Sequence, residues 1–507
     1  MTQDSTLDSG LRASLAKHAK RTAFASSQHT LTYAELDKAV EDAVGWLAER
    51  SVTPGDRVLL QMDKGIAFLL LHLANMRMGS VTVPIHPLST AQEVAYAIRD
   101  CSPLLLVCGL QEDRAQPSSL PEHNGTAVAF VSPSERPVGK APRQSDPPQP
   151  GDLACLLYTS GTTGPPKGAR LLHRQLAANI AILAKSWGWT PEDRLLHVLP
   201  LFHVHGLFVA ASVALHCGAT LELATRFEPS ETWKALLSGR ISLFMGVPTM
   251  YHRLLSAAPA TAPRPTAVRL FTSGSAPLRP ETLRAFEALT GQVILERYGM
   301  TEVGMAASNP LHGTRKPGSV GPALPGVGLR IAPPPTGREP DSEDIGEVQI
   351  SGASIFDGYW NRPEQTEQSF TKDGWLRSGD LGFLDSDGYL HLVGREKELI
   401  ISGGLNVYPR EVETALDEHP YVAESAVCGV PDEDFGEAVV AGVVLHAKSQ
   451  PGSVPDLEEL LAWARVRLAP YKLPKRIAFL TELPRNAMGK VQKDRLSSLP
   501  ELRGSGS

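Results

Sequence analysis

The stretch of sequence that decides the fold reads Tyr158-Thr-Ser-Gly-Thr-Thr-Gly-Pro-Pro-Lys-Gly168, and an apolar run at residues 153–158 predicts a strand leading into it. Glycine permits positive φ and close backbone approach, so several backbone N–H groups can face one anion. The Ser and Thr hydroxyls add hydrogen-bond donors, and the lysine adds a point charge that suits phosphate. The composition therefore predicts a loop that cradles a polyphosphate, with candidate contacts from Thr159, Ser160, Gly161, Thr162, Thr163, Gly164 and Lys167.

This loop differs from the Walker A phosphate loop. A Walker A loop places a glycine before its lysine and a Ser or Thr after it, whereas Pro166 and Gly168 flank Lys167 here. Because helical spacing follows, we expect the loop to lie between a strand and a helix, which is a usual setting for anion binding. A surface turn rich in Ser, Thr and Gly is the alternative. The residues at helical spacing are Leu176, Ile180, Leu183 and Trp187.

Composition excludes several classes of protein. The 507 residues exceed what one core usually supports, and 42% apolar with 21% charged residues is typical of a soluble globular protein. A net charge of −6 offers no basic footprint for nucleic acid. The five cysteines form no Cys-x-x-Cys pair, which favours a reducing compartment and argues against a disulfide scaffold or structural zinc.

The termini and the apolar stretches predict a cytoplasmic protein without a membrane span. Residues 1–6 lack a basic region followed by an apolar run, so we expect no secretory signal. Residues 65–85 are the most apolar stretch, but His72 and Arg77 interrupt it, so we expect a buried helix followed by a strand. No motif indicates an obligate protein partner.

The order of predicted elements indicates an α/β fold. Short β-rich runs alternate with helical patterns, for example a strand at 57–61, a helix at 64–78 and a strand at 80–85. A further strand is expected at 293–298, leading into a loop at 299–304. The pattern changes near residue 395, after which helices are expected at 409–418 and 457–468. We therefore predict two domains, residues 1–394 and 395–507.

Four further motifs follow the glycine loop in order. They are Tyr298-Gly-Met-Thr-Glu302, Ser378-Gly-Asp380, Gly394-Arg395 with Lys397-Glu398 and Ser402-Gly-Gly404, and Pro484-Arg-Asn-Ala-Met-Gly-Lys490. Together with the loop, they resemble the adenylate-forming superfamily of acyl-CoA synthetases, luciferases and peptide-synthetase adenylation domains, over roughly residues 30–495. The resemblance implies a large multi-sheet N-terminal domain and a small mobile α+β C-terminal domain.

The resemblance implies an ATP site that needs donors and a metal aimed at the phosphate oxygens. The glycine loop would hold the β and γ phosphates. Thr301, in the motif that begins at Tyr298, would contact the α-phosphate, and Glu302 would bind Mg²⁺. The alternative for Glu302 is a solvated loop carboxylate. The segment that resembles the adenine-packing turn consists of Ser273, Gly274 and Ser275.

The later motifs imply a ribose site and a moving domain. Asp380 would accept the ribose hydroxyls, although Ser378 stands where threonine is commoner in the family, and Arg395 would reach the ribose or form an ion pair at the domain boundary. Lys490 would bridge the substrate carboxylate and phosphate during adenylation, with a surface lysine as the alternative. The domain would rotate about Lys397, and the pantetheine thiol would pass Gly403 and Gly404.

The choice of acid rests on Arg297, which directly precedes Tyr298 at a predicted strand end. A guanidinium buried beside an acyl site is costly unless an anion meets it, and a dicarboxylate supplies one. The chain most resembles malonyl-CoA synthetases, which also accept methylmalonate, in the segments His203-Val-His-Gly-Leu207, Val247-Pro-Thr-Met-Tyr251, Ser273-Gly-Ser-Ala-Pro277 and Glu296-Arg-Tyr-Gly-Met-Thr-Glu302. The resemblance implies that Arg297 would pair with the distal carboxylate and that His205 would be a supporting donor. An ordinary ion pair is the alternative for Arg297. No third ligand accompanies His203 and His205, which argues against a metal pair.

The leading hypothesis is an ATP-dependent malonate–CoA ligase that uses ATP, Mg²⁺ and CoA. The alternatives are a medium-chain or aryl acyl-CoA synthetase, a stand-alone adenylation enzyme serving a carrier protein, and a luciferase-like oxygenase. No carrier domain follows residue 500 in this sequence, which favours free CoA.

Overall fold

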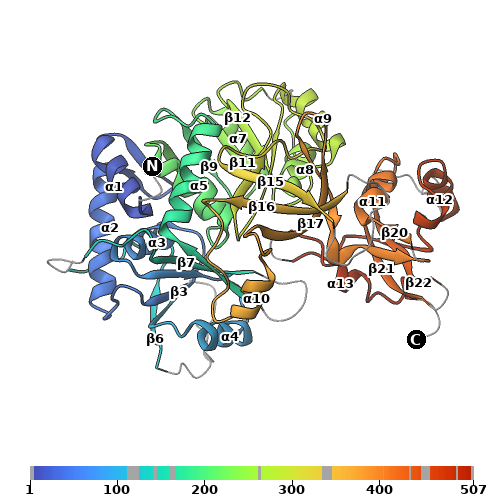
Figure 1. Ribbon diagram of the computed structural model, residues 1–507. Coiled ribbons are helices and arrows are strands. Elements are labelled where there is room, and N and C mark those ends of the chain that lie inside the picture. The colour runs from blue at the N-terminus through green and yellow to red at the C-terminus, as the bar shows by residue number, and fades with distance from the viewer. Residues whose placement is uncertain are drawn as a thin grey trace. The chain divides into compact units, whose positions relative to one another are not determined.

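The computed structural model divides into two compact units, and each has its own sheets (Figure 1). Unit 1 comprises residues 1–328 and 350–376, and unit 2 comprises residues 329–349 and 377–507. The structure describes residues 5–110, 125–140, 146–159, 166–260, 264–333, 345–403, 405–432, 435–446, 457–486 and 489–503.

Unit 1 contains a six-stranded sheet in the order β6-β5-β3-β4-β7-β8. Its neighbours are parallel except β7 and β8, which are antiparallel. The predicted strand at 57–61 is confirmed as β3, and the strand at 80–85 as β4, one residue shorter at each end. The strands are β3 (Arg57–Gln61), β4 (Val81–Pro84), β5 (Leu105–Gly109), β6 (Ala127–Val131), β7 (Leu153–Thr159) and β8 (Lys167–Leu172).

The position of the glycine loop differs from the expectation. The loop joins β7 to β8, and the helix α5 (His173–Ser186) begins only after β8, so the expectation of a strand-to-helix loop is wrong. The pairing brings Thr159 opposite Lys167 and Tyr158 opposite Gly168. Because β8 finds its backbone partners in β7, a paired strand rather than a helix follows the loop.

The second sheet of unit 1 has eight strands in the order β14-β13-β12-β11-β9-β10-β1-β2. Strands β13, β12, β11, β9, β10 and β1 are parallel along this path, so their carboxyl ends meet at one edge, where α/β proteins commonly bind ligands. The strands are β1 (Thr22–Ala25), β2 (Thr30–Thr32), β9 (Arg194–His197), β10 (Thr220–Leu223), β11 (Leu243–Gly246), β12 (Leu270–Ser273), β13 (Leu295–Met300) and β14 (Gly304–Ser308).

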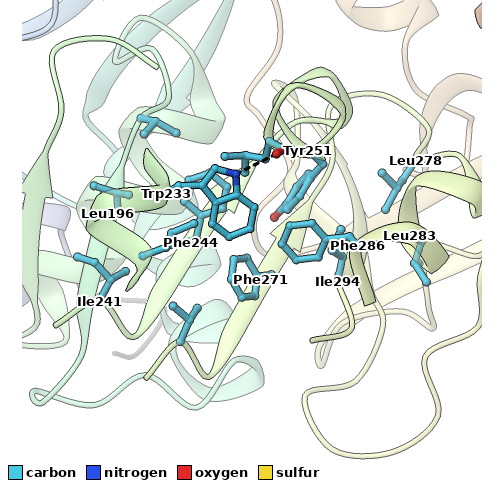
Figure 2. Packing of buried hydrophobic residues seen from close by; sticks show 14 residues of the cluster. Leu196, Trp233, Ile241, Phe244, Tyr251, Phe271, Leu278, Leu283, Phe286 and Ile294 are labelled. Carbon is cyan, nitrogen blue, oxygen red and sulfur yellow. Dashed lines mark hydrogen bonds between the residues drawn. The ribbon is translucent and has the colours of Figure 1, made fainter. Parts of the chain in front are cut away.

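An aromatic core packs on this sheet (Figure 2). Figure 2 shows Phe244 and Phe271 from neighbouring strands beside Trp233, Tyr251 and Phe286 from three helices. The Tyr251 and Phe286 rings meet edge to face with centroids 5.2 Å apart, a geometry that adds to the hydrophobic gain. The Trp233 indole nitrogen also donates to the Leu254 carbonyl over 2.9 Å. This core fixes the strands whose ends carry the candidate site.

Helices cover the two sheets of unit 1. The predicted helix at 64–78 is confirmed as α3, and all of its residues are buried. The helices of unit 1 are α1 (Leu7–Lys17), α2 (Tyr33–Ala48), α3 (Ile66–Met78), α4 (Ala91–Cys101), α5 (His173–Ser186), the π-helix η1 (His205–Ser212), α6 (Val213–His216), α7 (Pro229–Leu237), α8 (Pro248–Ser256), α9 (Pro280–Thr290) and α10 (Pro363–Gln368).

Unit 2 combines two sheets with short helices. A four-stranded sheet has the order β15-β16-β17-β18, and a second sheet has the order β20-β19-β22-β21 with β23 paired to β22. The predicted helices at 409–418 and 457–468 are confirmed as α11 and α12. The elements are β15 (Val327–Ala332), β16 (Gly346–Gly352), β17 (Leu376–Leu384), β18 (Leu390–Arg395), η2 (Glu396–Glu398), β19 (Ile400–Ser402), β20 (Leu405–Val407), α11 (Pro409–Asp417), β21 (Val422–Asp432), β22 (Gly436–Leu445), α12 (Leu457–Arg465), η3 (Pro470–Lys472), β23 (Arg476–Leu480) and α13 (Lys493–Leu496).

The fold therefore confirms the expected α/β class, with several sheets in a large N-terminal part and a smaller C-terminal part. The predicted domain boundary at residue 395 is the point where the mobile C-terminal domain would begin. This boundary stays a prediction. Among the described residues, no helix combines the length and the apolar character that a membrane span requires.

Candidate active site

The two ends of the glycine loop are held by the β7–β8 hairpin. The Thr159 hydroxyl donates to the Lys167 carbonyl over 3.4 Å, across the base of the loop. Tyr96 of α4 donates its hydroxyl to the Pro166 carbonyl over 2.7 Å, so a helix also supports the loop. The other predicted phosphate contacts lie outside the described residues; they are Ser160, Gly161, Thr162, Thr163 and Gly164.

Glu302 lies in the turn between β13 and β14, with only 6% of its surface exposed. Its carboxylate accepts a hydrogen bond of 2.8 Å from the Tyr359 hydroxyl. The Lys167 ammonium lies 5.2 Å from the centroid of the same Tyr359 ring. The structure therefore brings two predicted ATP-site residues together around a tyrosine. Tyr298 is buried on β13, and Thr301 is half-buried in the turn.

Sequence reasoning did not find Tyr359. Its only signal is the run Asp357-Gly-Tyr-Trp360, where two aromatic residues follow a glycine in a segment without regular periodicity. Such a signal is weak, because aromatic residues in a loop most often only pack.

Arg297 is buried at the carboxyl-terminal half of β13, with 3% of its surface exposed. Within the described parts of the chain, its guanidinium has no carboxylate partner, and its buried Nε has no hydrogen-bond partner. Burial lowers the pKa of Arg297 to about 9. A buried cation without a counter-charge is costly, so this arrangement is suited to an anion that arrives with a ligand.

His205 is the closest polar neighbour of this guanidinium. Its Nε2 contacts the Arg297 Nη2, and its Nδ1 lies 3.3 Å from the Ser275 hydroxyl. A guanidinium only donates, so Nε2 accepts and the proton of the neutral ring resides on Nδ1, facing Ser275. Burial, followed by the charge of Arg297, holds the pKa of His205 well below its usual value. His205 therefore orients the arginine, and a donor role toward a substrate stays a prediction.

The backbone around this pair is shaped for close approach. Ser275 has a positive φ of 71°, which is uncommon for a residue with a side chain and recurs at functional sites. A Cβ on Gly274 would meet the guanidinium of Arg297, so any larger residue would displace that guanidinium. His205 opens the π-helix η1, a rare conformation that is also enriched at functional sites.

Lys64 is a second residue that the sequence analysis missed. Its ammonium donates to the carbonyls of His197 and Leu199 over 3.2 and 3.1 Å, at the end of β9 and just before the segment that carries His205. Burial lowers the pKa of Lys64 to about 7. The lysine thereby ties the six-stranded sheet to the strand end that leads into the site.

In unit 2, Asp380 and Arg395 lie opposite each other on β17 and β18. The Arg395 Nε is 3.0 Å from the Asp380 carboxylate, and the aspartate is buried while the arginine is partly exposed. Ser378 donates to the Val348 carbonyl over 2.6 Å and accepts from the Asp380 amide over 3.0 Å. Serine at this position therefore keeps a hydroxyl that braces the aspartate. Whether the two residues hold a ribose stays a prediction.

Lys490 is exposed in unit 2. Its backbone N–H donates to the Asn486 side chain over 3.0 Å, and Asn486 N–H donates to the Lys490 carbonyl over 2.9 Å. Gly489 has a positive φ of 77°. These two hydrogen bonds fix the backbone of Lys490 against Asn486.

The other predicted residues of unit 2 lie in turns. Lys397 is exposed in η2, directly after β18. Gly403 forms the turn between β19 and β20 with a φ of 60°, and Gly404 lies outside the described residues. Their hinge and thiol-channel roles stay predictions.

Comparison with known proteins identifies the protein family. Residues 11–360 match the AMP-binding enzyme family, and residues 411–490 match the AMP-binding enzyme C-terminal domain. The chain belongs to the AMP-binding enzyme family.

Individual relatives refine this class. The chain is 41% identical over 370 residues to the malonate–CoA ligase of Arabidopsis thaliana, a match that covers 68% of this chain and 60% of that protein. It is 36% identical to the mitochondrial malonate–CoA ligase ACSF3 of Homo sapiens over 87% of this chain and 82% of that protein. The crystal structure of ATP-bound MatB from Rhodopseudomonas palustris is similar, with a TM-score of 0.91, 40% identity and coverage of 98% of both chains.

Proposed function

We propose that the chain is an AMP-forming acid–CoA ligase that activates malonate or methylmalonate with ATP and transfers the acyl group to CoA. The observation that carries the choice of acid is Arg297, a buried cation at a strand end without a carboxylate partner among the described residues. Two relatives named malonate–CoA ligase support the same choice.

The distal carboxylate is the feature of the substrate that Arg297 would recognise. When one carboxylate of malonate has reacted, the second still carries a charge, and it can form charge-assisted hydrogen bonds with the guanidinium. A fatty or aryl acid would leave the arginine buried and unpaired, which costs free energy in the complex. Because His205 accepts from Nη2, it would fix the plane of the guanidinium for this contact.

The residues present fit a magnesium ion that is held mainly by its nucleotide. The described residues contain no group of three or more His, Cys, Asp or Glu side chains that could hold a metal by themselves. Mg²⁺ at nucleotide sites usually has one or two protein carboxylates, with phosphates and waters completing its shell. Glu302 would supply that carboxylate, and bound Mg²⁺ would neutralise charge on the leaving phosphates.

The residues of unit 1 would place ATP for the first half-reaction. A malonate carboxylate oxygen attacks the α-phosphorus, the bond to the bridging oxygen breaks, and pyrophosphate leaves. Lys167 and the glycine loop would hold the pyrophosphate, Thr301 the α-phosphate, and the segment from Ser273 to Ser275 the adenine, with Tyr298 beside it. The product is the malonyl-adenylate.

The residues of unit 2 would serve both half-reactions. Asp380 and Arg395 would hold the ribose, and Lys490 would bridge the carboxylate and the α-phosphate while charge accumulates there. Rotation of residues 395–507 about Lys397 would then bring the turn at Gly403 and Gly404 to the adenylate. The CoA thiol, losing its proton, attacks the acyl carbon, and AMP leaves with the bonding electron pair.

The experiment that tests this function is a panel of acids assayed by AMP release with and without CoA. We expect malonate and methylmalonate to exceed butyrate and benzoate, with thioester formed only when CoA is present. Equal rates with butyrate or benzoate would favour a medium-chain or aryl acyl-CoA synthetase. Adenylate formation without transfer to CoA would favour an adenylation enzyme serving a carrier protein.

We also propose a cytoplasmic location, on the basis of the thiols. All five cysteines lie in the described parts of the chain, and all are free. Four of them are buried, and burial raises the pKa of Cys108 and Cys428 to about 11, which makes them unreactive. Cell fractionation should recover the protein with cytoplasmic markers; recovery from an oxidising compartment would contradict the proposal.

A further inference from the structure

The segment Phe356–Arg362 connects the two elements that carry Lys167 and Glu302. Along β8, the Arg170 amide donates to the Gly358 carbonyl over 2.9 Å, and the Trp360 amide donates to the Gly168 carbonyl over 2.8 Å. At its other end, the Phe356 amide donates to the Glu302 carbonyl over 2.7 Å. The segment is therefore hydrogen-bonded both to the strand that begins with Lys167 and to the turn that carries Glu302.

Tyr359 lies in the middle of this segment and contacts both functional groups. Its hydroxyl donates to Glu302 Oε1 over 2.8 Å, and its ring centroid lies 5.2 Å from the Lys167 ammonium. A carboxylate that accepts such a bond has one preferred orientation, and a cation over an aromatic face is attracted to it. The Tyr359 side chain thus fixes the Glu302 carboxylate directly and attracts the Lys167 ammonium toward that carboxylate.

The position of Tyr359 is itself fixed by its neighbours. Its amide donates to the Thr366 hydroxyl over 2.9 Å, and its ring packs on Phe356 with centroids 4.8 Å apart. Just beyond it, Arg362 pairs with Asp100 over 2.8 Å. Asp100 also accepts from the Tyr158 hydroxyl over 2.8 Å, next to the glycine loop. These contacts hold the phenol ring on a rigid support, as a positioning group requires.

We propose that Tyr359 is a positioning residue that holds the Glu302 carboxylate and the Lys167 ammonium in place for a magnesium-bound pyrophosphate group. This inference rests on the proposed function. It assigns the hydroxyl one task, to orient the carboxylate, and the ring another, to attract the lysine. A residue that only packs would use neither its hydroxyl nor the face toward Lys167.

The test is Tyr359→Phe in the full chain, because phenylalanine keeps the ring and the packing and removes only the hydroxyl. Binding of Mg²⁺ in the presence of α,β-methylene-ATP is measured by titration calorimetry. We expect about 10- to 100-fold weaker Mg²⁺ binding, the range found when a partner of a metal ligand is removed. The KM for malonate at saturating Mg²⁺ should stay at the wild-type value. Unchanged Mg²⁺ binding would overturn the inference.

Tyr33→Phe is the matched control. The Tyr33 hydroxyl also donates within unit 1, to the carbonyls of Ala219 and Leu215 over 2.7 and 3.1 Å. Tyr33 begins α2 and contacts neither Glu302 nor Lys167 through these hydrogen bonds. This variant should lower the thermal midpoint and leave Mg²⁺ binding unchanged. If both variants weaken Mg²⁺ binding equally, the weaker binding comes from a general loss of stability, and the inference is overturned.

A double-mutant comparison gives a second, independent measurement. In the Glu302→Gln background, Tyr359→Phe should weaken Mg²⁺ binding no further, because the carboxylate that it orients is gone. Additive losses would overturn the assignment. The two proposals can fail separately. If the wild-type protein forms no adenylate from any acid, the proposed function is refuted. If Tyr359→Phe still weakens Mg²⁺ binding in that case, this inference is supported.

Discussion

Arg297→Ala is the substitution that most sharply tests the choice of acid. The wild-type guanidinium is buried, it is contacted by the neutral ring of His205, and it has no carboxylate partner within the described residues. A bound malonate would supply the missing negative charge, whereas butyrate would not. The substitution should therefore lower the activity with malonate but not the activity with butyrate.

The magnitude follows from the burial of the guanidinium. The lowering of the Arg297 pKa from 12.5 to about 9 corresponds to roughly 5 kcal/mol of penalty on the charged form, at about 1.36 kcal/mol per pH unit. Removing one partner of a buried charge pair costs about 3–5 kcal/mol. Since about 1.36 kcal/mol is a factor of ten, kcat/KM for malonate should fall by roughly 100- to 5000-fold. That for butyrate should stay unchanged or rise, because alanine leaves no unpaired charge.

The assay is AMP release at several concentrations of malonate and of butyrate, for wild type and variant. Arg315→Ala is the matched control. The Arg315 guanidinium donates to the Val293 carbonyl over 2.6 Å, just before β13, so its loss disturbs the same strand without touching the site. This control should keep the wild-type ratio of malonate to butyrate activity. An equal loss for both acids in Arg297→Ala would refute the pairing with a distal carboxylate.

The remaining predictions concern the adenylation lysine, the fit around Arg297 and acid stability. Lys490→Ala should abolish adenylate formation but spare thioester formation from supplied malonyl-adenylate; an equal loss in both partial reactions would refute its role. Gly274→Ala should reproduce the loss of malonate selectivity expected for Arg297→Ala, because the new Cβ meets the guanidinium; unchanged selectivity would contradict this fit. Urea unfolding should show the free energy of unfolding falling as the pH drops from 6.5 toward 4. The cause is that the buried histidines stay neutral in the folded protein, whereas the unfolded chain takes up protons. Each such histidine lowers the free energy of unfolding by about 1.4 kcal/mol per pH unit. A free energy of unfolding that does not change with pH would contradict this reasoning, and His72→Leu should make the pH dependence less steep. Burial lowers the histidine pKa values to about 3 for His72, about 4 for His173 and about 3 for His197.

Local chemistry in the sequence was sufficient for part of this protein. The strand at 57–61 and the helix at 64–78 were predictable because each is a continuous apolar run of suitable length, and because the glycine that ends the helix acts within a few residues. The order of motifs from the glycine loop to Lys490 was sufficient to indicate the family, which the comparisons confirm. The prediction that a helix directly follows the glycine loop is wrong. Residues 167–172 carry no local signal that they pair with β7.

The sequence by itself determined the fold class, the family and the candidate residues, because these depend on residue types and their spacing. Only the tertiary structure decided which residues meet. Tyr359 reaches Glu302 across 57 positions of the chain, and Arg297 reaches His205 across 92. Contacts of this range leave no periodic signal, since they join segments that only the folded chain brings together. The absence of a described carboxylate beside Arg297, which carries the choice of acid, is likewise a property of the packed structure.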